Sequence, residues 1–254
     1  SDMHCLSDIP HLQRLVLADV KLNNLEPLRM LTKLQHLSIR GNAHIDDLEP
    51  LCNLTALRHL QLCTCTRITD LTPLQRLSNL TTLFLDGCGL VTNIGPLQSL
   101  TGLRHLDLSR CIQVTDLVPL AGMINMEVLH LNICQHITSL EPLRYMYSLR
   151  TLGLNLCDQV TCIEPLRGLF ELQQLDLGGC GLITDFDPLR GLGHLQELDL
   201  GACYNLTHVG SLRGLRSLQR LDLSLCHGVT DIGALRGLTS LQRLDLAQCT
   251  QISK

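Results

Sequence analysis

Two histidines and an aspartate occupy positions from which they could share one site. His105 and Asp107 flank a leucine, and His130 follows at the equivalent point of the next similar segment. Imidazole beside carboxylate is the material of a metal or acid–base site, and Ser109 would complete a serine, histidine and aspartate set. However, no strained elbow motif positions that serine, and the 11 histidines of the chain produce such neighbours by chance. We therefore predict that the protein is not an enzyme and has no metal site and no cofactor.

Cysteine is the next residue type whose chemistry needs an explanation. Of the 13 cysteines, nine recur every 23 residues, namely Cys65, Cys88, Cys111, Cys134, Cys157, Cys180, Cys203, Cys226 and Cys249. Disulfides between neighbours are disfavoured because a whole-strand spacing exceeds the ~3.8 Å between bonded Cβ atoms, and zinc sites need paired short spacings. We expect buried, inert thiols. So many unpaired thiols indicate an intracellular, reducing compartment, the cytoplasm or the nucleus.

A leucine repeat positions all of these residues. Segments that read Leu-x-x-Leu-x-Leu recur at a spacing of 22 once and then 23 nine times. Their leading residues are Leu12, Leu34, Leu57, Leu80, Leu103, Met126, Leu149, Leu172, Leu195, Leu218 and Leu241. An insertion would break this period, so we predict a single domain over residues 1–254 with about eleven coils of 23 residues. Neither end carries the polar cap that terminal repeats normally need, so we expect a fragment that lacks both caps.

Each coil is expected to form one strand and one turn. In Leu-x-Leu both leucines point to one side, so one strand face is buried, and leucine supplies 61 of the 254 residues for that core. Stacked coils align their strands in parallel at ~4.8 Å. In Asp-Leu-x-Pro-Leu, aspartate can cap a short 3₁₀ turn and proline suits its first positions. The predicted fold class is an α/β repeat solenoid with a concave parallel β-sheet and short 3₁₀ turns on the convex side.

The repeated unit resembles the leucine-rich repeat family over almost the whole chain. It reads Leu-x-x-Leu-x-Leu-x-x-Cys-x-x-Ile/Val-Thr-Asp-Leu-x-Pro-Leu-x-x-Leu-x-x, and residues 57–79 and 103–125 lie close to it. Its first half is similar to the cysteine-containing subclass found in substrate-recognition subunits of ubiquitin ligases. Its second half is similar to the repeats of internalins and of a phosphatase regulatory subunit, and the combined unit looks most like trypanosomatid leucine-rich repeat proteins. The resemblance implies a right-handed superhelix.

Positions that vary between coils and point outward are the candidates for recognition, because the repeated positions build the fold. The outward residues of the last four strands are all aspartate, and arginines recur on the far side of the coils. We interpret both as solvated charges; the alternatives are a dedicated site for a basic ligand at the aspartates and a site for carboxylates or phosphates at the arginines. Apolar and aromatic residues gather in the central coils, where an exposed patch indicates an interface. The predicted partner-binding residues are Phe84, Asp107, Val128, His130, Ile133, Tyr147, Leu156 and Phe170.

Charge and hydropathy restrict the class of partner. The net charge is −4 and the pI is about 6.2, so no electrostatic attraction to nucleic acid or an anionic membrane is expected. No apolar run reaches the ~18 to 20 residues of a spanning helix. We predict a non-catalytic scaffold that binds a protein through its concave face and central repeats, without nucleic acid, membrane or small-molecule substrate. The alternative is a substrate-recognition module of a ubiquitin ligase complex.

Overall fold

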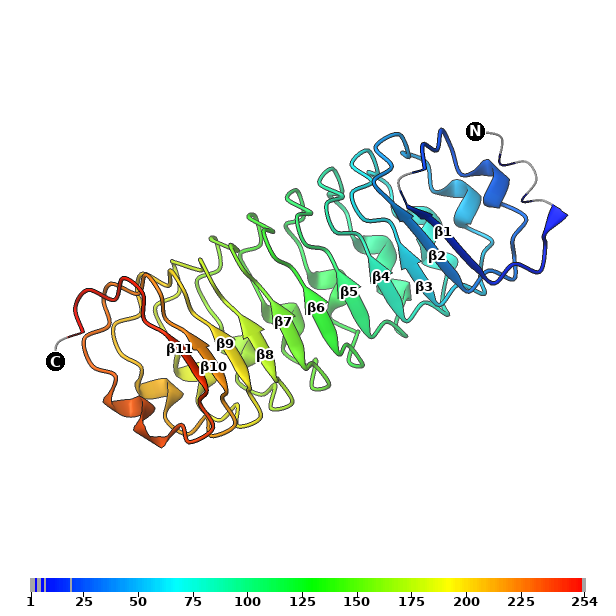
Figure 1. Cartoon of the computed structure of the whole chain (residues 1–254). Coiled ribbons are helices and arrows are strands. Elements are labelled where there is room, and N and C mark those ends of the chain that lie inside the picture. Colours follow the sequence, from blue (N-terminus) through cyan, green and yellow to red (C-terminus); the bar gives the residue numbers. More distant parts are fainter. Residues whose placement is uncertain (1–2, 4–5, 7, 19, 253–254) are drawn as a thin grey trace. The chain divides into compact units, whose positions relative to one another are not determined.

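The computed structural model describes residues 3, 6, 8–18 and 20–252 of the chain (Figure 1). Two compact units divide it, a first unit of residues 1–126 and a second unit of residues 127–254. Each unit is built from the same alternation of one short strand and one 3₁₀ turn per coil. Among the described residues, no helix is long and apolar enough to cross a membrane.

The first unit holds five parallel strands in chain order: β1 (Arg14–Ala18), β2 (His36–Arg40), β3 (His59–Gln61), β4 (Thr82–Phe84) and β5 (His105–Asp107). Each strand pairs with the next so that equivalent residues of successive repeats lie side by side, as Leu37 does with Leu60 and Leu60 with Leu83. The intervening 3₁₀ turns are η2 (Glu26–Leu28), η3 (Glu49–Leu51), η4 (Thr72–Arg76), η5 (Gly95–Ser99) and η6 (Val118–Leu120).

The second unit repeats this plan with six parallel strands: β6 (Val128–His130), β7 (Thr151–Gly153), β8 (Gln174–Asp176), β9 (Glu197–Asp199), β10 (Arg220–Asp222) and β11 (Arg243–Asp245). Its 3₁₀ turns are η7 (Glu141–Leu143), η8 (Glu164–Leu166), η9 (Asp187–Leu189), η10 (Gly210–Leu212) and η11 (Gly233–Gly237). These parallel strands and 3₁₀ turns confirm the predicted α/β repeat solenoid.

The core of both units is made by the inward leucines. Leu60 and Leu83 in the first unit and Leu154 and Leu177 in the second are fully buried. Each buried leucine stabilises the folded chain by about 1.5–3 kcal/mol, so a single aliphatic residue type suffices when every coil contributes several copies.

The 3₁₀ turns begin as the sequence predicts. A proline occupies one of the first two positions in each of η2 to η9. Two residues before the turn, an aspartate carboxylate accepts the backbone N–H of the first turn residue at 2.7–2.8 Å, which satisfies a donor that the turn itself cannot pair. The aspartates that do so are Asp47, Asp70, Asp116, Asp185 and Asp231.

The repeating cysteines line the interior, as predicted. The Cys88 thiol donates to the Leu62 carbonyl at 3.2 Å, and the Cys180 thiol donates to the Leu154 carbonyl at 3.2 Å. In the coil before Cys65 the same slot holds Asn42, which bonds to backbone groups of its own and the preceding coil. Burial raises the pKa of both thiols to about 12. These thiols are therefore buried and protonated at neutral pH, and an unreactive thiol follows from that state.

Candidate functional site

The structure places the predicted partner-binding residues in three different regions. We call the outward side chains of the strands the strand face. Phe84 and Asp107 lie on the strand face of the first unit, and Val128 and His130 lie on that of the second. The remaining four belong to the second unit but flank its strands: Ile133 and Leu156 follow β6 and β7, whereas Tyr147 and Phe170 precede β7 and β8. Within the second unit, the predicted residues thus occupy the strand face and both ends of the strands.

Aromatic rings gather at the start of the strands of the second unit. Tyr147 and Phe170 are 57% and 56% exposed, which confirms that the core does not require them. Tyr145 packs edge-on against Tyr147, with 6.2 Å between ring centroids. The Tyr147 ring lies against Gly168 of the following coil. We call Tyr145, Tyr147 and Phe170 the aromatic turn patch.

Ile133 and Leu156 occupy a tight corner that sequence reasoning does not detect. Both have left-handed backbone conformations, with φ of 63° and 56°. In the same slot the residues with positive φ are Gly41, Thr64, Gly87, Arg110, Gly179, Ala202, Leu225 and Gln248. The corner turns the chain inward just before the cysteine position, and its N–H groups reach the next coil, as from Leu156 to the Gly178 carbonyl at 2.7 Å. Side-chain type at this slot is therefore secondary to backbone shape.

The strand face of the first unit is varied and contains little charge at its centre. The His36 and His59 rings stack with 4.4 Å between centroids and 6° between planes. Burial, followed by the charges of His36, His105 and Arg58, lowers the pKa of His59. Beside this pair, the Ser38 hydroxyl donates to the Gln61 side-chain oxygen at 2.8 Å. The first unit thus presents stacked imidazoles and neutral hydrogen-bonding groups.

Metal-binding groups are not clustered in the part of the chain that the structure describes. No three histidine, cysteine, aspartate or glutamate side chains gather there at a spacing suited to a metal ion. Asp107, which sequence analysis considered beside His130, has one carboxylate oxygen engaged by the backbone N–H of Ser109 at 2.8 Å. This bond fixes the orientation of the Asp107 carboxylate.

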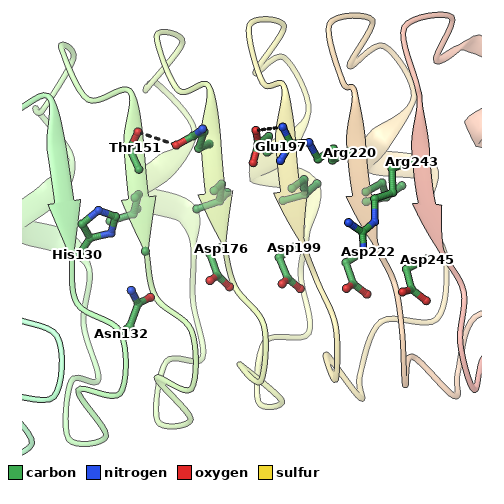
Figure 2. Close-up of a pocket in the computed structure, with 16 residues that line it drawn as sticks. His130, Asn132, Thr151, Asp176, Glu197, Asp199, Arg220, Asp222, Arg243 and Asp245 are labelled. Carbon is green, nitrogen blue, oxygen red and sulfur yellow. Dashed lines mark hydrogen bonds and ion pairs between the residues drawn. The ribbon is translucent and has the colours of Figure 1, made fainter.

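The strand face of the second unit carries a row of aspartates over a hollow. Figure 2 shows Asp176, Asp199, Asp222 and Asp245 side by side at the ends of β8 to β11. We call these four residues the Asp row. They border an open groove of about 330 Å³ that is also lined by His130, Asn132, Thr151, Gln174, Arg220 and Arg243. Of the predicted partner-binding residues, only His130 lines this groove.

Backbone hydrogen bonds hold the Asp row in place. One carboxylate oxygen of each member accepts the N–H of the residue two positions later, at 2.7–2.9 Å. Each carboxylate therefore has a fixed orientation, and its second oxygen is not used by this turn. Because these bonds hold the carboxylates in one orientation, little side-chain entropy would be lost if a ligand contacted them.

Negative charge accumulates along the Asp row. Burial raises the pKa of Asp199, and the charges of Asp176, Asp222 and Asp245 add to the increase, although the bond from Gly201 opposes it. On the neighbouring column, Arg220 is paired with Glu197 at 3.1 Å. Arg243 forms no ion pair among the described residues. The groove is thus lined by five carboxylates and two guanidinium groups.

Missing side chains shape the groove floor. Gly178, next to the Asp row but outside the groove lining, has no room for a side chain, because a Cβ there would lie 3.2 Å from a carboxylate oxygen of Asp176 and of Asp199. A Cβ at Gly153 would lie 2.7 Å from the Asn132 side-chain oxygen. The sequence contained part of this signal, since four successive strands end in aspartate, but their interpretation as a solvated ladder missed the hollow beside them.

Three of the arginines on the far side of the coils form local ion pairs. Arg144 and Arg167 each form two hydrogen bonds to the glutamate three residues earlier, Glu141 and Glu164, at 2.5–2.8 Å. Arg190 pairs with Asp187 at 3.0 Å. These exposed pairs satisfy the guanidinium groups within the turn, in agreement with their interpretation as solvated charges.

A family model described as Leucine Rich repeats (2 copies) matches residues 10–53, 32–76 and 78–122. No curated protein matches the chain. The sequence match therefore concerns the repeat pattern of the first unit, and it leaves the similarity to trypanosomatid proteins as a prediction.

Solved structures resemble this chain along most of its length. An internalin (inlF) of Listeria monocytogenes is 23% identical, with a TM-score of 0.56, and the match covers 98% of this chain and 90% of the internalin. Internalin C2 (inlC2) of the same bacterium is 22% identical, with a TM-score of 0.58 and coverage of 95% and 83%. A chain of the mouse RP105/MD-1 complex is 21% identical, with a TM-score of 0.69 and coverage of 92% and 42%. At these identities the likeness concerns the fold.

Proposed function

We propose that this chain is a leucine-rich repeat protein and a non-catalytic scaffold that binds a protein partner through its strand face. The observation that carries the proposal is the contrast between inward side chains that are nearly uniform, mostly leucine, and outward side chains that differ between the two units. A face whose backbone is held by parallel strand pairing loses little conformational entropy when it binds.

Support for a protein partner comes from the kinds of side chain on display. Phe84, Asp107, Val128 and His130 are half-buried on the strand faces, and they combine an aromatic ring, an aliphatic group and ionisable groups. The aromatic turn patch adds exposed rings of the type that dominate protein interfaces. Among the similar structures, the mouse RP105/MD-1 complex is by its name an assembly of two proteins.

We also propose that the protein acts in a reducing, intracellular compartment. The thiols of Cys88 and Cys180 donate hydrogen bonds to carbonyl oxygens of the preceding coil. A cysteine can donate in this way only while it is reduced, so an oxidising compartment would threaten the interior of the coils.

Affinity capture with surface variants tests the proposed function. The purified chain would be used to capture partners from a native lysate, and bound proteins would be identified by mass spectrometry. Two variants separate the surfaces: Phe84→Ala with His130→Ala on the strand faces, and Tyr147→Ala with Phe170→Ala on the aromatic turn patch. We expect the partner to be lost with the strand-face variant while the thermal unfolding curve is unchanged.

Two outcomes would contradict this proposal. Loss of the partner only with the aromatic turn variant would move the binding surface away from the strands. If both variants still captured the partner, neither surface would be the binding surface. The ubiquitin ligase alternative rests on the cysteine-containing half of the repeat and stays a prediction; co-capture of other ligase subunits would favour it.

A further inference from the structure

We propose that the strand face of the second unit docks an extended, arginine- or lysine-bearing segment of a partner protein, with its cationic side chains along the Asp row. This inference rests on the proposed function and deepens it, because it specifies the chemistry of the partner. It depends on three observations: an open groove over an unpartnered sheet face, a row of fixed carboxylates, and an excess of negative charge.

The groove provides space for a bound chain. It encloses about 330 Å³ beside β6 to β11, and its lining includes neutral hydrogen-bonding side chains at one end, Asn132, Thr151 and Gln174. Gly153 lines the groove without a side chain beside these groups. A peptide backbone can therefore approach the sheet face while its side chains reach the carboxylates.

The carboxylates are oriented to accept charge-assisted hydrogen bonds. One carboxylate oxygen of Asp199 accepts the Gly201 N–H at 2.8 Å, and one of Asp222 accepts the Ser224 N–H at 2.7 Å. The second oxygen of each is available to a guanidinium or ammonium group. Such bonds are roughly twice as strong as neutral ones, and a guanidinium can span two acceptors.

Charge complementarity determines the kind of occupant. Only Glu197 among the five carboxylates of the groove has a basic partner within ion-pair distance in the described part of the chain, Arg220 at 3.1 Å. A cationic ligand would relieve the repulsion between the four members of the Asp row. Arg243 also lines the groove, and a peptide offers it carbonyl oxygens, whereas a simple polyamine does not.

The length of the row matches a short extended segment. Four parallel strands separated by ~4.8 Å place the first and last aspartates about 14 Å apart. An extended chain advances ~3.3 Å per residue, and alternate side chains point to one side. Three cationic residues at alternate positions would therefore span about 13 Å and face the row together.

A synthetic peptide tests this assignment. The probe is a fluorescein-labelled, N-acetylated heptapeptide with arginines at positions 2, 4 and 6 and glycines elsewhere, and the same peptide with glutamine in place of arginine is the control. Fluorescence anisotropy would be measured with the whole chain at about 0.15 M salt, where long-range attraction is largely screened. We expect saturable binding of the arginine peptide and none of the glutamine peptide.

Matched variants distinguish binding at the Asp row from attraction by the net charge of the chain. The Asp199→Asn and Asp222→Asn double variant keeps an oxygen to accept the backbone N–H, so the fold is preserved while two charges are removed. The Asp158→Asn and Glu171→Gln double variant removes two exposed charges of the same unit outside the groove. We expect affinity to fall about tenfold or more in the first variant and less than about twofold in the second.

Several results would overturn the inference. Equal weakening in both variants would mean that binding follows net charge alone. Spermidine bound as tightly as the peptide would assign the row to a small cation, and saturable Ca²⁺ binding without peptide binding would assign it to a metal ion. If the Asp199→Asn and Asp222→Asn variant still captures the lysate partner that the Phe84→Ala and His130→Ala variant loses, this inference fails while the proposed function stands.

Discussion

The two units have the same interior and different strand faces. Leu83 in the first unit and Leu198 in the second occupy the same inward slot, and both are buried. On the outward side, the first unit presents stacked imidazoles and a Ser38–Gln61 hydrogen bond, whereas the second presents the Asp row and its groove. The inward side is limited by close packing, while solvent tolerates many side chains on the outward side.

This difference shows where information about function resides in a repeated chain. The inward residues are nearly interchangeable between units, so they describe the coil and say nothing about the partner. The outward residues depart from one another in charge, size and polarity, and that departure distinguishes the two faces.

The largest effect is expected from a cavity in either interior. Leu83→Ala in the first unit and Leu198→Ala in the second should each lower the free energy of unfolding by about 3 kcal/mol, because both remove the same buried side chain from the same slot. Urea denaturation followed by circular dichroism measures the change. If the losses of unfolding free energy in the two variants differed by more than about 2 kcal/mol, which is over half of the expected effect, the two interiors would not be equivalent.

A smaller and equal effect is expected from the cysteine slots. Cys88→Ala and Cys180→Ala each remove a thiol that donates to a carbonyl at 3.2 Å. The loss of the bond and of the sulfur's packing should cost about 1 to 2 kcal/mol in each unit. Urea denaturation under reducing conditions checks this cost, and the exposed Cys162→Ala variant is the control. An unchanged midpoint in both variants would show that the thiols only fill space.

The strand faces should respond in opposite ways to acid. The pKa of His59 is lowered in the folded chain relative to its ordinary value of about 6.5. As the pH falls through that range, the unfolded chain therefore binds more protons than the folded chain. Wild type should lose stability relative to His59→Gln as the pH falls. The pKa of Asp199 is raised, so a penalty present at neutral pH should be relieved as the pH falls toward about 4. Urea denaturation of each variant and wild type across this pH range measures both differences. Parallel trends would contradict the assigned environments.

The interior was predictable from the sequence, and the faces were predictable only in part. Every inward position must satisfy one packing requirement, so the period of leucine and cysteine was enough to place Leu83 and Cys88. The exposure of Tyr147 and Phe170 also followed, because the same slot holds small polar residues in other coils. The groove beside Asp199 did not follow, since its depth depends on which neighbouring side chains are absent. The left-handed backbone at Ile133 and Leu156 did not follow either, because φ values are not visible in residue types.

The smallest effect is expected at the left-handed corner, where the two units differ in residue but share a backbone shape. Ala202 has a φ of 55° and Gly87 a φ of 76° in equivalent slots. Ala202→Gly should raise stability by about 0.5 kcal/mol, because relief of the left-handed strain exceeds the entropy cost of glycine. Gly87→Ala should lower stability by about 1 kcal/mol, since the new Cβ would also lie 3.1 Å from Thr64 Cγ2. Thermal unfolding of the reciprocal pair measures both changes, and shifts of the same sign would show that the corner does not have one conformation in the two units.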